Sequence, residues 1–104
     1  MTERYRRKKK RMKDPKYRAK YRAAQLARTR RRKYGISQEV FDEMLADQGE
    51  RCLICRRKRK LCVDHDHETG EVRGLLCQQC NIGLGAFGDN PRYLRRAIRY
   101  LMEG

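Results

Sequence analysis

Two cysteine pairs constrain the fold of this chain more than any other feature. Cys52 and Cys55 form one C-x2-C pair, Cys77 and Cys80 form the other, and 21 residues separate the pairs. This spacing is close to that of a four-thiolate structural zinc site, because one tight turn can supply both members of a pair. A redox-active pair is the rival interpretation, but no thioredoxin-like βαβ pattern surrounds either pair. Four thiolate ligands leave no open position, so we expect one structural zinc ion per chain.

The part of the chain around these cysteines is small and electrically balanced. Residues 34–104 hold 11 Lys and Arg against 11 Asp and Glu. A core of this size supplies only a few kcal/mol, and zinc binding would add directly to folding free energy. Cys62, the fifth cysteine, lies between apolar neighbours, and we assign it no role beyond that of a small buried hydrophobe. The odd number of cysteines also favours a metal over disulfides.

The N-terminal third carries the whole excess of positive charge. Residues 1–33 contain 17 Lys and Arg against Glu3 and Asp14, a net of +15. Such a segment repels itself and is expected to be partly helical or disordered. Nucleic acid is the favoured partner, because neutralised phosphates release counterions. A solubilising tail and an anionic membrane surface are the alternatives, and the segment has few large apolar residues for the latter. We therefore predict a DNA-binding arm at 1–33 and a separate domain at 34–104.

No stretch approaches the roughly 20 apolar residues of a membrane span, and no apolar signal-peptide core follows the basic start. An intracellular, cytoplasmic protein with no membrane partner is expected.

Local signals predict a small α+β domain. Asp14 and Ser37 are candidate helix N-caps, and Gly35 and Gly49 suit helix ends. The expected elements are helices over 14–33 and 37–49, a hairpin of strands near 61–63 and 72–76 around a turn at 68–71, a short helix after Cys77 and a helix from Asn90. The expected buried face of the second helix is Val40, Phe41, Met44 and Leu45. The arginines of the last helix, at 92, 95, 96 and 99, form either a phosphate-binding surface or a solvated face.

The run "DHDH" at 64–67 and Asn81, directly after a zinc ligand, are left unexplained by the zinc site. Each residue alone could simply cap a turn, but the combination also suits chemistry. Carboxylate and amide oxygens are ligands for Mg²⁺ or Mn²⁺. A neutral imidazole, with an ordinary pKa of about 6.5, can take a proton from water. Together these groups could hydrolyse a phosphodiester with one metal ion.

A regular strand would separate these groups. His65 would share a face with Val63, whereas Asp64 would point to the opposite face. The catalytic arrangement therefore requires the strand to bend or end near residue 64.

The segment "VDHDHETGEVRGLLCQQCN", preceded by "CLIC" and followed by "LGAFGDNP", resembles the recombination endonuclease VII family, a zinc-stapled branch of the HNH (ββα-metal) nucleases common in bacteriophages. The resemblance covers roughly residues 34–91. It implies that His65 is the general base, that Asp64 and Asn81 bind the catalytic divalent ion, and that His67 assists at the scissile phosphate. Asp66 and Glu68 match the pattern with less clear roles. The C-terminal part that junction resolvases use for dimerisation is not expected here.

The resulting hypothesis is a Mg²⁺- or Mn²⁺-dependent DNA endonuclease, a phosphodiester hydrolase leaving 5′-phosphate and 3′-hydroxyl ends as the resemblance implies. Its substrate is duplex or branched DNA, and both a monomer and a homodimer are compatible with the sequence. A non-catalytic zinc module that binds nucleic acid is one alternative. An accessory packaging protein whose basic arm is its main functional part is another.

Overall fold

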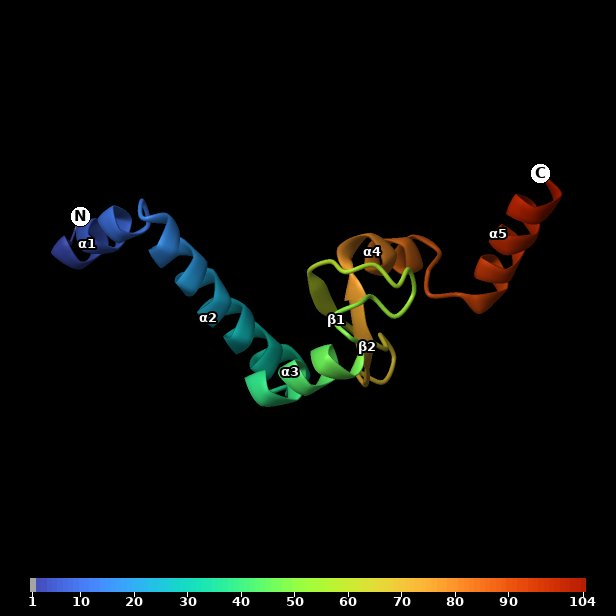
Figure 1. Ribbon diagram of the computed structural model, residues 1–104, viewed down its shortest axis with the longest axis horizontal. Helices are drawn as coiled ribbons and strands as arrows, with labels where there is room; N and C mark the ends of the chain where they lie inside the picture. Colours follow the sequence, from blue (N-terminus) through green and yellow to red (C-terminus); the bar gives the residue numbers. More distant parts are fainter. Residues whose placement is uncertain (1) are drawn as a thin grey trace. The chain divides into compact units, whose positions relative to one another are not determined.

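The computed structural model describes residues 2–104, except for the side chains of Tyr5 and Lys8. The chain divides into two units, Met1–Phe41 and Asp42–Gly104, which we describe separately. In chain order the elements are α1 (Glu3–Arg11), α2 (Pro15–Tyr34), α3 (Gln38–Asp47), β1 (Leu61–His65), β2 (Val72–Cys77), α4 (Gln78–Ala86) and α5 (Pro91–Glu103) (Figure 1).

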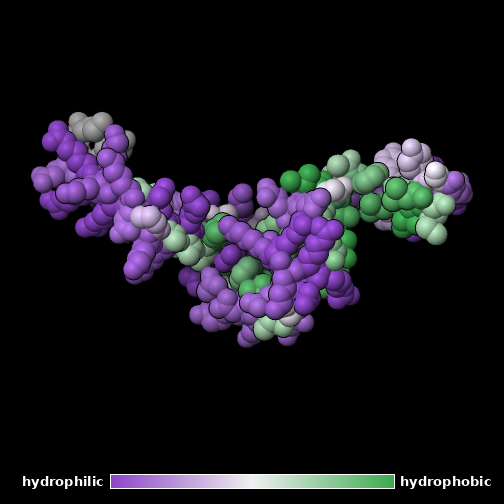
Figure 2. Space-filling model, turned by 45° about the horizontal axis from the view of Figure 1, so that its top comes forward, coloured by the Kyte–Doolittle hydropathy of each residue, from purple (hydrophilic) through white to green (hydrophobic). Residues whose placement is uncertain are grey.

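The long helix α2 begins and ends at the residues that its sequence predicts. The Asp14 carboxylate accepts a hydrogen bond from the Lys16 backbone N–H at 3.0 Å, and Pro15 opens the helix. Gly35 ends it in the left-handed conformation, at φ +65°. No residue of α2 is buried, and Figure 2 shows hydrophilic residues over most of the N-terminal helices. Packing therefore contributes little to α2, and its caps and local propensity define it.

The buried face of α3 is narrower than predicted. The Ser37 hydroxyl accepts from the Val40 backbone N–H at 3.2 Å, which confirms Ser37 as the cap. Phe41 is buried and Met44 and Leu45 are half-buried, but Val40 is 43% exposed. The prediction of a buried Val40 was wrong, because the face runs through positions 41, 44, 45 and 48 and Val40 lies at its edge.

The hairpin contains an irregularity at the site of interest. β1 and β2 are antiparallel, with Leu61 opposite Cys77 and Asp64 opposite Gly74. His65 pairs with Val72, so one residue of β2, Arg73, has no partner on β1. This is a β-bulge, which bends a strand and changes the direction of nearby side chains. An irregularity near residue 64 is therefore present, as the predicted bend requires, but β1 does not end there and continues to His65.

A glutamine side chain completes the outer edge of β2. Gln48 donates through Nε2 to the Leu75 carbonyl at 2.9 Å and accepts at Oε1 from the Leu75 N–H at 3.0 Å. It therefore pairs with Leu75 as a neighbouring strand would. Gly74 allows the loop that contains Leu53 to lie close to β2, because a Cβ at position 74 would be 2.6 Å from Leu53 Cδ1. The fully or nearly buried residues of this unit are Cys52, Leu61, Val63, Asp64, Gly74, Leu75, Leu76 and Cys77.

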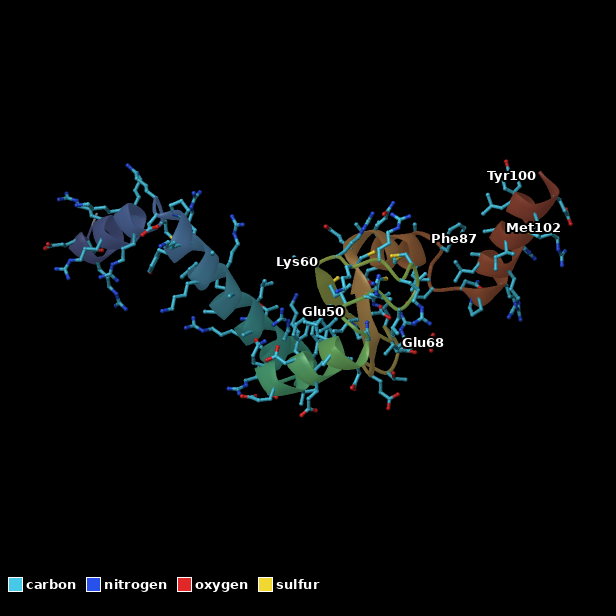
Figure 3. The ribbon with its side chains drawn as sticks, viewed as in Figure 1. Glu50, Lys60, Glu68, Phe87, Tyr100 and Met102 are labelled. Atoms are coloured by element: carbon cyan, nitrogen blue, oxygen red, sulfur yellow. The ribbon has the colours of Figure 1, made fainter. Side chains whose placement is uncertain are left out.

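The two C-terminal helices differ in their packing. α4 has Cys77 as its N-cap and lies against both strands of the hairpin (Figure 1). Asn90 is the N-cap of α5, as predicted, but no residue of α5 is buried. Tyr100 and Met102 are 77% and 83% exposed, and Figure 3 shows them on this helix. Every helix within residues 2–104 is too short or too polar to cross a membrane.

Candidate functional site

The four cysteines of the two pairs converge on one point. Their sulfur atoms all lie within 4.8 Å of one another, and the Sγ atoms of Cys55 and Cys77 are 3.8 Å apart. With zinc–sulfur bonds of about 2.3 Å, the edge of a thiolate tetrahedron is about 3.8 Å. The donor set and its spacing therefore fit a tetrahedral zinc ion, as the sequence predicts.

Local backbone structure brings each pair into position. In the first pair the chain turns tightly, because the Arg56 N–H donates to the Cys52 carbonyl and the Cys52 N–H donates to the Arg57 carbonyl. In the second pair Cys77 ends β2 and is also the N-cap of α4, where its sulfur accepts from the Cys80 N–H. The cysteine cluster thus fixes the start of α4 against the hairpin.

The cysteine thiols have different proton affinities. Burial raises the pKa of Cys52, but backbone N–H groups of Cys77, Cys55 and Ile54 outweigh it, and its pKa falls to about 6. The Cys80 N–H similarly lowers the pKa of Cys77. Burial raises the pKa of Cys80 to about 12. The thiolate of Cys52 therefore forms readily, whereas Cys80 keeps its proton until a metal replaces it.

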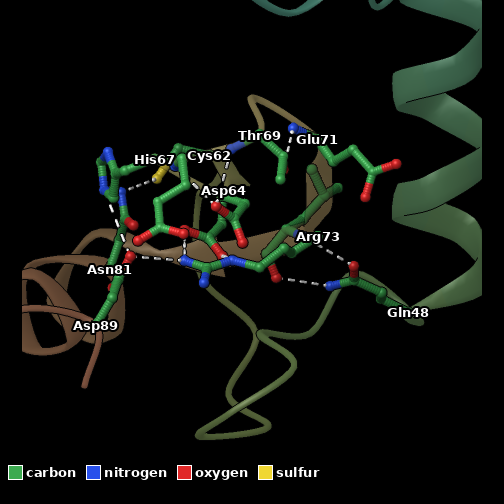
Figure 4. Close-up of polar contacts among 12 residues, drawn as sticks. Gln48, Cys62, Asp64, His67, Thr69, Glu71, Arg73, Asn81 and Asp89 are labelled. Atoms are coloured by element: carbon green, nitrogen blue, oxygen red, sulfur yellow. Dashed lines mark hydrogen bonds and ion pairs between the residues drawn. The ribbon is translucent and has the colours of Figure 1, made fainter. Parts of the chain in front are cut away.

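The bulge brings Asp64 into a network with a residue that the sequence analysis missed. Asp64 is a buried polar residue, and both of its carboxylate oxygens accept from Arg73, at 2.8 Å from Nε and 3.1 Å from Nη2. Nη2 of Arg73 also donates to Asp89 Oδ2 at 3.2 Å. Figure 4 shows Arg73 between the two carboxylates. The pKa of Arg73 is raised, first by its hydrogen bond to Asp64.

The two histidines lie side by side at the end of β1. The ring centroids of His65 and His67 are 4.8 Å apart with a 62° angle between the rings. His67 is also joined to Asp89, with Nε2 3.6 Å from Oδ2. Asn81 donates through Nδ2 to the Cys62 sulfur at 3.9 Å, a weak contact that orients its amide (Figure 4). Cys62, to which we gave no role, thus contacts one of the predicted site residues.

Asp66 has a structural position in the hairpin turn. Its Oδ1 accepts from the backbone N–H groups of Glu68 at 2.8 Å and Thr69 at 3.1 Å. These two bonds, Thr69 first, lower the pKa of the Asp66 carboxyl group. This is an Asx-turn, which a short acidic side chain commonly makes. Glu68 is exposed and lines a cavity of about 270 Å³ together with His67, Arg73 and Asp89.

A divalent cation other than zinc is expected at Asp64 and Asn81, whose side-chain oxygens are ligands for Mg²⁺ or Mn²⁺. Within residues 2–104 the cysteine cluster is the only grouping of three or more Cys, His, Asp or Glu ligands at metal-binding distance. A second ion would therefore rely on few protein oxygens, those of Asp64 and Asn81. Mg²⁺ commonly binds in this way, with one or two carboxylates and with water or substrate phosphate as its other ligands.

Among the site residues that the sequence analysis did not identify, only Arg73 could have been found from a feature of the sequence. Gly74 inside a strand pattern indicates a bulge or a close backbone approach, and its neighbour is then redirected. Asp89 and Gln48 had no such feature, because their contacts join segments distant in sequence.

The β-hairpin is followed by a helix, and four cysteines positioned for one metal ion join the two. This arrangement defines a small protein of the ββα-metal class. The chain belongs to the recombination endonuclease VII family, whose sequence model matches residues 27–103. It is 47% identical over 75 residues to the Gene 59 protein of Mycobacterium phage L5. The aligned region covers 67% of this chain and 46% of the Gene 59 protein. The Gene 59 protein of Mycobacterium phage D29 is 49% identical over the same length, with the same coverage. The crystal structure of the β-β-α-Me type II restriction endonuclease Hpy99I is similar with a TM-score of 0.49 and 32% identity, over 73% of this chain and 47% of that one. The chain thus spans about half the length of the relatives it matches.

Proposed function

We propose that this protein is a divalent-metal-dependent DNA endonuclease that hydrolyses phosphodiester bonds with a histidine general base. The observation that carries the proposal is the match to the recombination endonuclease VII family over residues 27–103. It is supported by the adjacent rings of His65 and His67 at the end of β1, next to the bulge that follows Asp64.

In this proposal Asp64 and Asn81 hold one Mg²⁺ or Mn²⁺ ion through their side-chain oxygens. When bound, the ion polarises the phosphate and stabilises the leaving oxygen. His65 accepts a proton from the attacking water through its ring nitrogen, and His67, whose side chain is 67% exposed, contacts the phosphate. The proton on His65 then passes to solvent. The Cys62 contact orients the Asn81 amide, with Nδ2 toward the sulfur.

In this proposal the basic N-terminal arm binds the DNA substrate non-specifically. Residues 1–33 carry the whole excess charge of +15, and phosphate contacts of this kind hold DNA without reading its sequence. Duplex DNA is therefore the proposed substrate, and it includes branched DNA, whose arms are duplexes.

A nicking assay tests the proposal directly. The zinc-loaded full chain is incubated with supercoiled plasmid with and without Mg²⁺ or Mn²⁺. His65→Asn retains the shape of the ring but not its basicity, and we expect it to lower the cleavage rate by about 10²–10⁴-fold. Glu43→Ala, an exposed change on α3, is the matched control. Cleavage by the His65 variant at the control rate, with zinc content unchanged, contradicts the proposal.

A second assay addresses the DNA structure. Cleavage of a four-way junction is compared with that of a linear duplex of the same sequence. A preference of tenfold or more for the junction, a threshold of about 1.4 kcal/mol, assigns a branched substrate. Equal rates assign duplex DNA in general.

One observation favours a non-catalytic zinc module that binds nucleic acid. Arg73 takes both oxygens of Asp64, the carboxylate that the nuclease needs for its ion. This alternative gives salt-sensitive DNA binding with no cleavage that depends on divalent ions.

A further inference from the structure

Arg73 sits where the divalent ion of the proposed nuclease would bind. It is the unpaired residue of the bulge, and its guanidinium group uses two nitrogen atoms to bind both oxygens of Asp64. Bidentate pairs of this kind are among the strong charge-assisted hydrogen bonds of proteins. Asp64 is 8% exposed at its side chain, so water cannot replace this partner easily.

A cation and a guanidinium group exclude one another at one carboxylate. Both are positive, and within a buried site their repulsion is weakly screened. An ion that binds Asp64 must therefore take at least one oxygen from Arg73. Without Arg73, however, the carboxylate of the metal-free protein would be buried and unpaired, which is strongly unfavourable.

Asp89 offers Arg73 a second position. Its Oδ2 already accepts from Nη2 of Arg73 at 3.2 Å, so the guanidinium can leave Asp64 and keep an acidic partner. The backbone fixes Asp89, since it follows Gly88 in the left-handed conformation and its N–H donates to the Leu84 carbonyl at 2.9 Å. The cavity of about 270 Å³ beside these residues gives the side chain space to move.

We propose that Arg73 is a gate on the divalent-ion site: it neutralises Asp64 in the metal-free protein, competes with the ion for that carboxylate, and moves to Asp89 when the ion binds. The inference rests on the proposed function, because it takes Asp64 as a metal ligand. It adds a positioning pair, Arg73 and Asp89, that sets how tightly the ion is held.

The test measures Mn²⁺ binding by electron paramagnetic resonance, with the zinc-loaded full chain and no DNA. Arg73→Gln removes the competitor, and we expect Mn²⁺ affinity to rise about tenfold, as the fraction of molecules with an accessible Asp64 increases. The same variant should unfold at a lower temperature in the absence of Mn²⁺. A merely structural role would lower both stability and affinity, so the opposite signs are diagnostic. Arg73→Lys keeps the positive charge but cannot make the bidentate contact with Asp64. If the Gln variant fails to fold, tighter Mn²⁺ binding by the Lys variant supports the same conclusion.

A double-mutant cycle tests the part played by Asp89. Asp89→Asn should weaken Mn²⁺ binding severalfold in the parent chain, because the displaced guanidinium loses its second partner. In the Arg73→Gln background the same change should have a smaller effect, and what remains is the loss of one negative charge. Equal effects in both backgrounds contradict the role of Asp89.

Asp64→Asn separates the failure of the gate from that of the proposed function. Mn²⁺ binding that depends on Asp64 but is unchanged or weaker in Arg73→Gln overturns the gate alone. The absence of any binding that depends on Asp64, in the parent and in Arg73→Gln, overturns the metal site and the gate together.

Discussion

At the scale of single residues, Gln48 makes the most informative contact outside the site. Its amide pairs with both backbone groups of Leu75, which is fully buried. Gln48→Ala should leave the Leu75 N–H without its partner and lower the free energy of unfolding by about 1–3 kcal/mol. Gln48→Glu should also destabilise, because it sets an oxygen against the Leu75 carbonyl. Thermal and denaturant unfolding of the zinc-loaded protein measure both effects.

Gln78→Ala provides the control for these variants. Gln78 lies exposed in the first turn of α4, and its replacement should change stability by no more than about 0.5 kcal/mol. Equal stability of the Gln48 and Gln78 variants would show that the pairing with Leu75 contributes nothing.

Residue chemistry was predictable to the extent that it is local. The ligand type of the four cysteines follows from their spacing, and the contact between the rings of His65 and His67 follows from their closeness in sequence. The partner of Asp64 was not predictable, because it depends on how β2 is paired with β1. An offset of one residue at the bulge decides which side chain faces that carboxylate.

At the scale of elements, the cysteine cluster joins the loop, the hairpin and α4. Chelation of the metal should unfold the second unit, since structural zinc in small domains contributes about 10 kcal/mol or more. Cys80→Ser should lose the zinc and the thermal transition, whereas Cys62→Ala should retain one zinc per chain. Elemental analysis and circular dichroism check both. Loss of zinc from the Cys62 variant, or a metal-free protein that melts normally, would contradict this role of the cluster.

The pKa values of the cluster predict how zinc binding depends on pH. At neutral pH Cys52, with a pKa of about 6, is largely ionised before the metal arrives. Cys80, with a pKa of about 12, is protonated and must release its proton. Affinity should therefore rise with pH, by about tenfold per unit for each proton released. Below pH 6 Cys52 adds a further proton, so the dependence becomes steeper. Chelator competition between pH 5.5 and 8 measures this slope, and an affinity independent of pH would be inconsistent with it.

The boundaries of elements were predicted better than their packing. Asp14, Ser37 and Asn90 cap their helices as expected, because a cap is a local hydrogen bond. The exposure of Val40 and of the apolar residues of α5 was not predictable. Periodicity shows that a helix has an apolar face, but not which surface covers it.

At the scale of the whole molecule, charge and family membership divide the chain in similar ways. The family match begins at residue 27, so most of the basic arm lies outside it. The boundary predicted at residues 33 and 34 remains a prediction, since the structure divides into units at Phe41. Residues 34–104 have no net charge, so the arm should dominate non-specific attraction to DNA.

Removal of residues 2–13 tests this dominance. The segment holds eight Lys and Arg against one Glu, and the Asp14 cap of α2 stays in place. Binding to a linear duplex is measured by fluorescence anisotropy over a range of salt concentrations without added divalent ions. The slope of log affinity against log salt should fall by several units, with an upper limit of about 7 at about 0.9 per phosphate. The comparison variant replaces Arg92, Arg95, Arg96 and Arg99 of α5 by Gln, and it should change the slope less, because acidic residues balance that unit. A larger change from the α5 variant would move the main DNA-binding surface from the arm to the last helix.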